Sequence, residues 1–213
     1  MRKKILNNRK GFTLAEMLIA LLITALAGLI ALGGLTVAAN SYKDILMKSQ
    51  AQMVMKGYMD SIRSTLTNVS SDSGFQIRRE TYNGETRVFF PNEKVNCAGY
   101  YSIKEINETI DGTDELIAKV LVFQHIDPTD YGTTDPGRRY SFDDVAEQTE
   151  LIAARSTKGF AVEPVGFNYH NVETDAEYGA FTGALKLKSL DPLSNGQFLE
   201  LEESFTIYPL NYH

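Results

Sequence analysis

An apolar run from residue 11 to residue 39 is the feature that most constrains this chain, and it carries a single ionisable side chain, Glu16. As an α-helix, the 28 residues from Phe12 to Ala39 would extend roughly 42 Å at about 1.5 Å per residue. The hydrocarbon core of a bilayer is about 30 Å thick, so a helix of this length can cross it. The sequence therefore predicts a membrane-spanning helix near the N-terminus.

The residues before this run indicate its orientation. Positions 2, 3, 4, 9 and 10 are basic, and the first ten residues contain no acidic residue. Positive flanks stay on the cytoplasmic side, so we expect the N-terminus inside and the C-terminus outside. An ordinary secretory signal has an apolar region of about 7–15 residues followed by a small-residue cleavage site. Here the run is about twice that length and its small residue, Gly11, precedes it, so such a signal does not fit.

The string KGFTLAE at residues 10–16, with the apolar residues that follow, resembles the cleavage and methylation motif of type IV prepilins and type II secretion pseudopilins. The resemblance implies cleavage after Gly11 by a prepilin peptidase and methyltransferase, which methylates the new N-terminus at Phe12. It also implies that Glu16 neutralises the terminal amine of a neighbouring subunit during assembly. A carboxylate among apolar helices needs such a partner, because an unpaired charge there is costly.

Two observations leave alternatives open at this stage. A single-pass anchor with a chance glutamate would also have a basic flank and a long apolar run. Many related pilins carry a proline about twenty residues into the helix, whereas this chain has Gly28, Gly33 and Gly34 in that region. Glycine lowers helix stability by about 0.8–1.0 kcal/mol relative to alanine, so these residues soften the helix or serve close packing between helices.

The charge balance and the cysteine count narrow the function classes. Removal of the five leader charges from totals of 21 basic and 27 acidic residues leaves 16 and 27, a net charge of −11. An acidic chain without a basic cluster gives no strong signal for nucleic-acid binding. Cys97 is the only cysteine, so no intramolecular disulfide can form. We expect a buried small side chain there, with a reactive thiol or an intermolecular bridge as alternatives.

The apolar helix is expected to continue as an amphipathic segment. Apolar residues recur at three-to-four spacing through residues 40–67, and a cluster of turn formers follows at residues 70–74. We predict one helix from residue 13 to about residue 67. Its methionines at positions 47, 53, 55 and 59 are interpreted mainly as packing against the core of the domain, with an adaptable partner surface as the alternative.

Beyond this helix the patterns indicate strands. The Asn83-Gly84 pair predicts a hairpin between strands at 75–82 and 85–90, and Asp111-Gly112 predicts another turn. We also predict a strand at 100–106, a central strand at 116–125 and a short helix at 142–156, followed by alternating strands. The expected fold is α+β and pilin-like, with the C-terminal half of the long helix packed on an antiparallel β-sheet head domain.

This pattern divides the chain into four parts. We expect a leader peptide at 1–11, a membrane or filament-core helix at 12–39, an amphipathic extension at 40–67 and a β-rich head at 68–213.

The search for chemistry yields no catalytic, cofactor-binding or metal-binding residues. The acidic loop 126–141 has ligand types that Ca²⁺ prefers, but its spacing does not match a calcium loop, so a solvated loop is favoured. His125, His170 and His213 lack metal-ligand spacing, and structural roles are assigned to His125 and His170. Phosphate-binding loops, nucleophile elbows and zinc-protease motifs are absent from the sequence. We therefore expect no enzymatic activity and no cofactor.

These observations favour a structural subunit of a type IV pilus, more specifically a minor pilin because the head is large. Alternatives are a pseudopilin of a type II secretion or competence system and a membrane-anchored adhesin that never polymerises. The expected partners are the prepilin peptidase and methyltransferase, other pilin subunits, the assembly platform and the cytoplasmic membrane. The precursor is expected in that membrane, and the processed subunit in the pilus at the cell surface.

Overall fold

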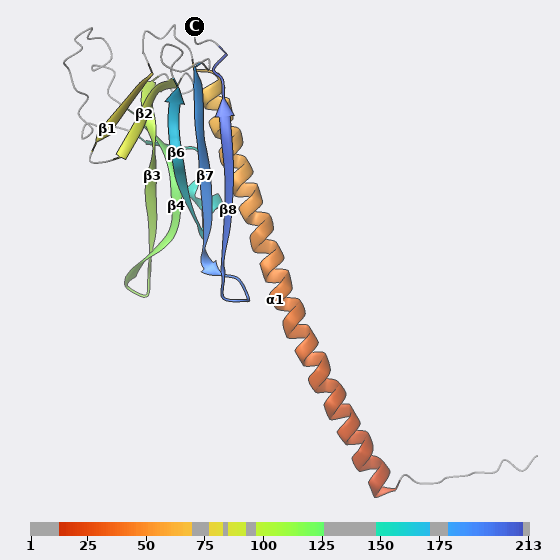
Figure 1. The fold of residues 1–213 in the computed structure, drawn as a ribbon. Coiled ribbons are helices and arrows are strands. Elements are labelled where there is room, and N and C mark those ends of the chain that lie inside the picture. Colours follow the sequence, from red (N-terminus) through yellow and green to blue (C-terminus); the bar gives the residue numbers. More distant parts are fainter. Residues whose placement is uncertain are drawn as a thin grey trace, which may run out of the picture. The chain divides into compact units, whose positions relative to one another are not determined.

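The computed structural model describes residues 13–69, 77–82, 85–92, 97–125, 148–170 and 179–210. A single long helix, α1 (Leu14–Thr67), precedes a β-sheet (Figure 1). Contacts divide the chain into two compact units, Met1–Ile45 and Leu46–His213, so α1 contributes residues to both. The helix ends within one residue of the predicted position, and the predicted α+β, pilin-like fold is confirmed.

The part of α1 within Leu46–His213 is amphipathic, as its spacing predicted. Its buried residues recur every three or four positions, which places them on one side of the helix: Ala51, Val54, Met55, Tyr58, Met59, Ile62, Thr65 and Leu66. Met55 and Met59 are in the core, whereas Met53 is 64% exposed. Met47 is partly buried against the same core, so the interpretation of the methionines as core residues is correct for Met47, Met55 and Met59 and wrong for Met53.

In the described ranges the sheet has eight strands, and seven of them lie in the order β1-β2-β3-β4-β6-β7-β8, with β5 paired to β4. Their bounds are β1 (Arg78–Tyr82), β2 (Glu85–Asn92), β3 (Cys97–Ile110), β4 (Thr113–His125), β5 (Gln148–Glu150), β6 (Phe160–His170), β7 (Ala180–Pro192) and β8 (Phe198–Ile207). Residues 83 and 84 lie outside the described residues, but Tyr82 pairs with Glu85 on either side of them, as expected for the predicted hairpin.

The turn between β3 and β4 shows why its sequence was informative. Asp111 and Gly112 have φ angles of 51° and 80°. A two-residue hairpin turn with positive φ at both positions matches the right-handed twist of its strands, and Asp-Gly adopts it readily. The long pairing from Gly99↔His125 to Ile110↔Thr113 follows from this turn. The strand predicted at 100–106 is therefore longer at both ends.

Two predictions need correction. The sheet is mixed, because β4 and β6 pair in parallel at Lys119↔Ala161, while the other pairs are antiparallel. The helix predicted at 142–156 is wrong for residues 148–156, where β5 and the 3₁₀ helix η3 (Ala154–Thr157) form instead; residues 142–147 lie outside the described residues. Because β5 runs back along β4 and η3 reverses the chain again, β6 starts in the direction of β4.

The core lies between α1 and one face of the sheet. It contains a group of aromatic rings in edge or tilted contact, in which the Phe90 centroid lies 5.3 Å from Phe123 and 5.7 Å from Phe181. Aromatic side chains bury large apolar areas, so these rings are a major source of the stability of the head. The amphipathic part of α1 covers them with Tyr58, Met59 and Ile62.

Candidate functional site

The N-terminus of α1 is closed by a reciprocal pair of residues. The backbone N–H of Thr13 donates to Oε2 of Glu16 at 2.8 Å, and the N–H of Glu16 donates to Oγ1 of Thr13 at 3.3 Å. The hydroxyl of Thr13 also donates to Oε2 at 3.1 Å. This is a capping box, which satisfies N–H groups that a helix start leaves without partners. The Thr-x-x-Glu spacing in the sequence carried this signal, and our sequence reasoning missed Thr13.

The cap uses only part of the Glu16 carboxylate. Both bonds go to Oε2, and Oε1 makes no hydrogen bond with any residue in the described ranges. A carboxylate oxygen can accept further bonds, so Oε1 is available to a cationic donor from outside the chain. The negative charge also lies at the positive end of the helix dipole, where an anion is favoured.

Glu16 lies at the start of a shallow hollow on the helix surface. Glu16, Ala20 and Thr24 are spaced four residues apart and therefore share one face of α1. Together with Met17 and Leu21, these residues line the hollow, which is open to the surroundings. Because this hollow holds no side chain of its own unit, a neighbouring helix can approach the carboxylate there.

The residues around this site are apolar and uncovered. The large apolar side chains from Leu14 to Val37 are each between 52% and 79% exposed. Within the described part of the chain, α1 is the one helix long and apolar enough to cross a membrane. Carbon atoms added at Gly28, Gly33 or Gly34 would meet nothing within 4 Å, so no contact inside the chain requires glycine at these positions. Whether they soften the helix or serve packing between helices stays a prediction.

Other predicted residues fall outside the described parts. Gly11 and Phe12, His213 and the acidic loop 126–141 are not described. Cys97 begins β3, but its side chain is not described either. The four-part division of the chain also stays a prediction.

The two described histidines contact threonine hydroxyls within the sheet. Nε2 of His125 lies 2.8 Å from Oγ1 of Thr149, and Nε2 of His170 lies 3.0 Å from Oγ1 of Thr182. In the described ranges, three or more histidine, cysteine, aspartate or glutamate side chains nowhere gather in a way that could hold a metal ion.

Comparison with known proteins is informative for the N-terminus. Residues 6–32 match the family described as the prokaryotic N-terminal methylation motif. The chain therefore carries the type IV prepilin signature, which is typical of structural pilin-type proteins and of their pseudopilin relatives. With the apolar helix, this signature indicates a membrane-anchored precursor. Neither a curated protein nor a solved structure matches the chain.

Proposed function

We propose that this chain is a minor structural subunit of a type IV pilus, processed by a prepilin peptidase and assembled through its N-terminal helix. The observation that carries the proposal is the methylation motif at residues 6–32, with Glu16 in the first turn of a helix whose large apolar side chains are exposed. Such a helix needs lipid around it before assembly and neighbouring helices afterwards.

Processing links the motif to assembly. In this proposal, cleavage between Gly11 and Phe12 removes the basic leader and leaves an amine on Phe12, two residues before α1 begins at Leu14. That amine is methylated and pairs with Oε1 of Glu16 on a neighbouring subunit. The pairing is favourable because neither charge is well solvated among apolar helices. The peptidase, other pilin subunits and the assembly platform are the partners, and the final location is the cell surface.

The first experiment is mass spectrometry of the N-terminal peptide from the native membrane. We expect a terminus at Phe12 with one added methyl group, and the same chain in sheared filaments at low stoichiometry. An intact Met1 would instead favour a membrane-anchored adhesin that does not polymerise. High abundance in the filaments would identify a major subunit.

A pseudopilin of a type II secretion or competence system would have the same processed terminus. Deletion of the gene separates these functions. Loss of secretion or DNA uptake with pili unchanged would contradict the pilus assignment.

A further inference from the structure

Two asparagines of this chain stand two residues before a hydroxyl residue. They are Asn68, followed by Ser70, and Asn107, followed by Thr109. Asn-x-Ser/Thr without proline at x is the acceptor pattern for N-glycosylation, which is found on surfaces outside the cytoplasm. The basic flank before the apolar helix predicts that the unit Leu46–His213 lies on that side of the membrane. The two asparagines differ in how easily a transferase can reach them.

Asn68 is tied to the end of α1. Its Nδ2 donates to the backbone carbonyl of Ser64 at 2.8 Å. The next residue, Val69, is fully buried in the core of the head. The carbonyl of Thr67 accepts the N–H of Leu210 at 3.0 Å, which holds a second segment against this end of the helix. A transferase must bind an acceptor together with its neighbours, so binding at Asn68 would pull Val69 out of the core.

Asn107 lies at the base of a two-stranded hairpin arm, defined here as residues 107–116 of β3 and β4. Within the described ranges these residues pair only with each other, because β2, β5 and β6 pair with β3 and β4 beyond the arm. Figure 1 shows the β3–β4 hairpin extending beyond β1 and β2. Residues 107–109 and 111–116 are all exposed. The acceptor sequence around Asn107 is therefore on the surface throughout.

The pairing within the arm is weak. The register shifts between Ile106 and Asn107, so the arm begins at an irregularity in the ladder. Glu108 lies directly opposite Glu115, and like charges in that position destabilise a strand pair. A two-stranded hairpin without further strands is marginally stable in water. Local opening of the arm therefore leaves the core intact and presents Asn107 in an accessible chain.

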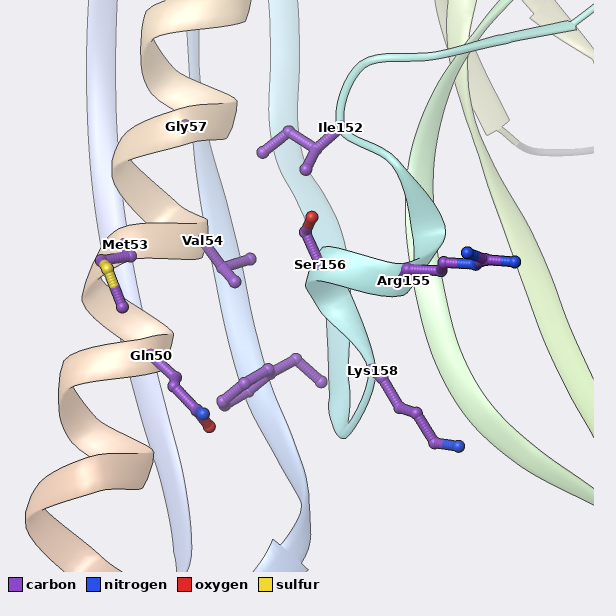
Figure 2. Close-up of a pocket in the computed structure, with 9 residues that line it drawn as sticks. Gln50, Met53, Val54, Gly57, Ile152, Arg155, Ser156 and Lys158 are labelled. Carbon is purple, nitrogen blue, oxygen red and sulfur yellow. The ribbon is translucent and has the colours of Figure 1, made fainter.

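Few side-chain contacts hold the acceptor sequence in place. In the part of the chain that the structure describes, the side-chain amide of Asn107 has no hydrogen-bond partner. The hydroxyl of Thr109 donates to Oδ1 of Asp114 at 2.6 Å, and Nζ of Lys158 lies 2.6 Å from Oε2 of Glu108. Lys158 is at the rim of a pocket between α1 and the segment after β5, and its side chain points away from α1 (Figure 2). Both contacts join exposed groups, which contribute little to stability.

We propose that Asn107 is an N-glycosylation site, modified by an oligosaccharyltransferase that uses a sugar carried on a lipid pyrophosphate. Nδ2 of Asn107 attacks the anomeric carbon of that sugar. The C–N bond forms as the bond from this carbon to the pyrophosphate oxygen breaks. The lipid pyrophosphate leaves with the bonding electrons, and a base of the transferase takes one amide proton. The hydroxyl of Thr109 is the second part of the acceptor that the transferase recognises.

Mass spectrometry of proteolytic peptides from the full-length protein, isolated from its native membrane, tests the site. We expect the peptide that contains Asn107 to carry the added mass of an oligosaccharide, which fragmentation assigns to this residue. The peptide that contains Asn68 should have its unmodified mass. Asn107→Gln should remove the added mass, whereas the matched variant Asn68→Gln should leave it unchanged.

Substitutions at Thr109 separate recognition of the acceptor from access to it. Thr109→Ala removes the hydroxyl together with its bond to Asp114, so it loosens the arm and nevertheless should abolish glycosylation. Thr109→Ser keeps a hydroxyl and should retain the glycan. Asp114→Ala is the matched control, because it removes the same hydrogen bond and leaves the acceptor sequence intact, and it should also retain the glycan.

The outcomes separate this inference from the proposed function. An unmodified Asn107 in the wild-type protein would overturn the glycosylation site, and so would a glycan that persists in Thr109→Ala or is attached to Asn68 instead. None of these results affects the assignment to a pilus. Conversely, a glycosylated chain that never enters filaments would overturn the proposed function and leave the glycosylation site intact.

Discussion

The capping contacts of Glu16 and its proposed pairing with a neighbouring amine can be separated by three substitutions at the start of α1. Thr13→Ala removes the hydroxyl half of the capping box and keeps the charge, whereas Glu16→Gln keeps an oxygen that can accept the N–H of Thr13 and removes the charge. Glu16→Ala removes both. The assay is the ratio of subunit in sheared filaments to subunit in the membrane, with cleavage after Gly11 as the control for insertion.

The expected magnitudes differ. Loss of a threonine cap costs about 1 kcal/mol, which corresponds to about a five-fold change in the population of the capped helix. If pairing with a neighbouring amine dominates, Glu16→Gln should lower incorporation well beyond the effect of Thr13→Ala and as far as Glu16→Ala. Incorporation of Glu16→Gln at the wild-type level, together with a defect in Thr13→Ala, would show that Glu16 acts only as a helix cap and would refute the pairing mechanism.

Three further predictions concern the head. Phe181→Ala removes a fully buried ring and should lower the free energy of unfolding by about 3–5 kcal/mol. Val165→Ala, at an exposed position, should change it by less than about 0.5 kcal/mol. Denaturant unfolding of the detergent-solubilised protein measures both changes. Gly99→Ala would place a carbon atom against the backbone carbonyl of Gln124, so we expect a lower thermal midpoint, and an unchanged midpoint would contradict the register of β3 on β4. Burial raises the pKa of Tyr58 from 10.0 to about 12. The fold favours the neutral phenol, so the neutral Tyr58 contributes to the free energy of unfolding below about pH 10, and this contribution is lost as the pH rises to about 12. Tyr58→Phe should lessen this alkaline loss of stability, as followed by unfolding at several pH values.

The local features of the chain were predictable because they depend on neighbouring residues. The apolar run and the three-to-four spacing after it predicted α1 to within one residue at its end. The Asp111-Gly112 turn was predicted because its dihedral angles suit that residue pair. Glu16 was identified from its place in the apolar run, and its capping partner Thr13 was present in the same pattern, although our reading overlooked it.

Features that depend on contacts between distant residues were not predictable in this way. Residues 148–150 form a strand because β4 offers a free edge to them, and this competes with the helical tendency of the local sequence. The parallel pairing of β6 with β4 follows from the pairing of β5 with β4, because the chain reverses direction once between β4 and β5 and again between β5 and β6. Met53 and Met55 lie only two residues apart but differ in burial, because Met55 faces the sheet and Met53 does not.

The amino-acid sequence by itself thus determined the helix, its prepilin signature at residues 6–32 and the position of Glu16, since periodicity, charge and short motifs act over a few residues. Only the tertiary structure decided the strand order, the close approach of Ile152 to Gly57 and the exposure of Met53 and Leu210. Those features arise where segments far apart in the chain pack together, and no local pattern specifies which side chains such packing leaves uncovered.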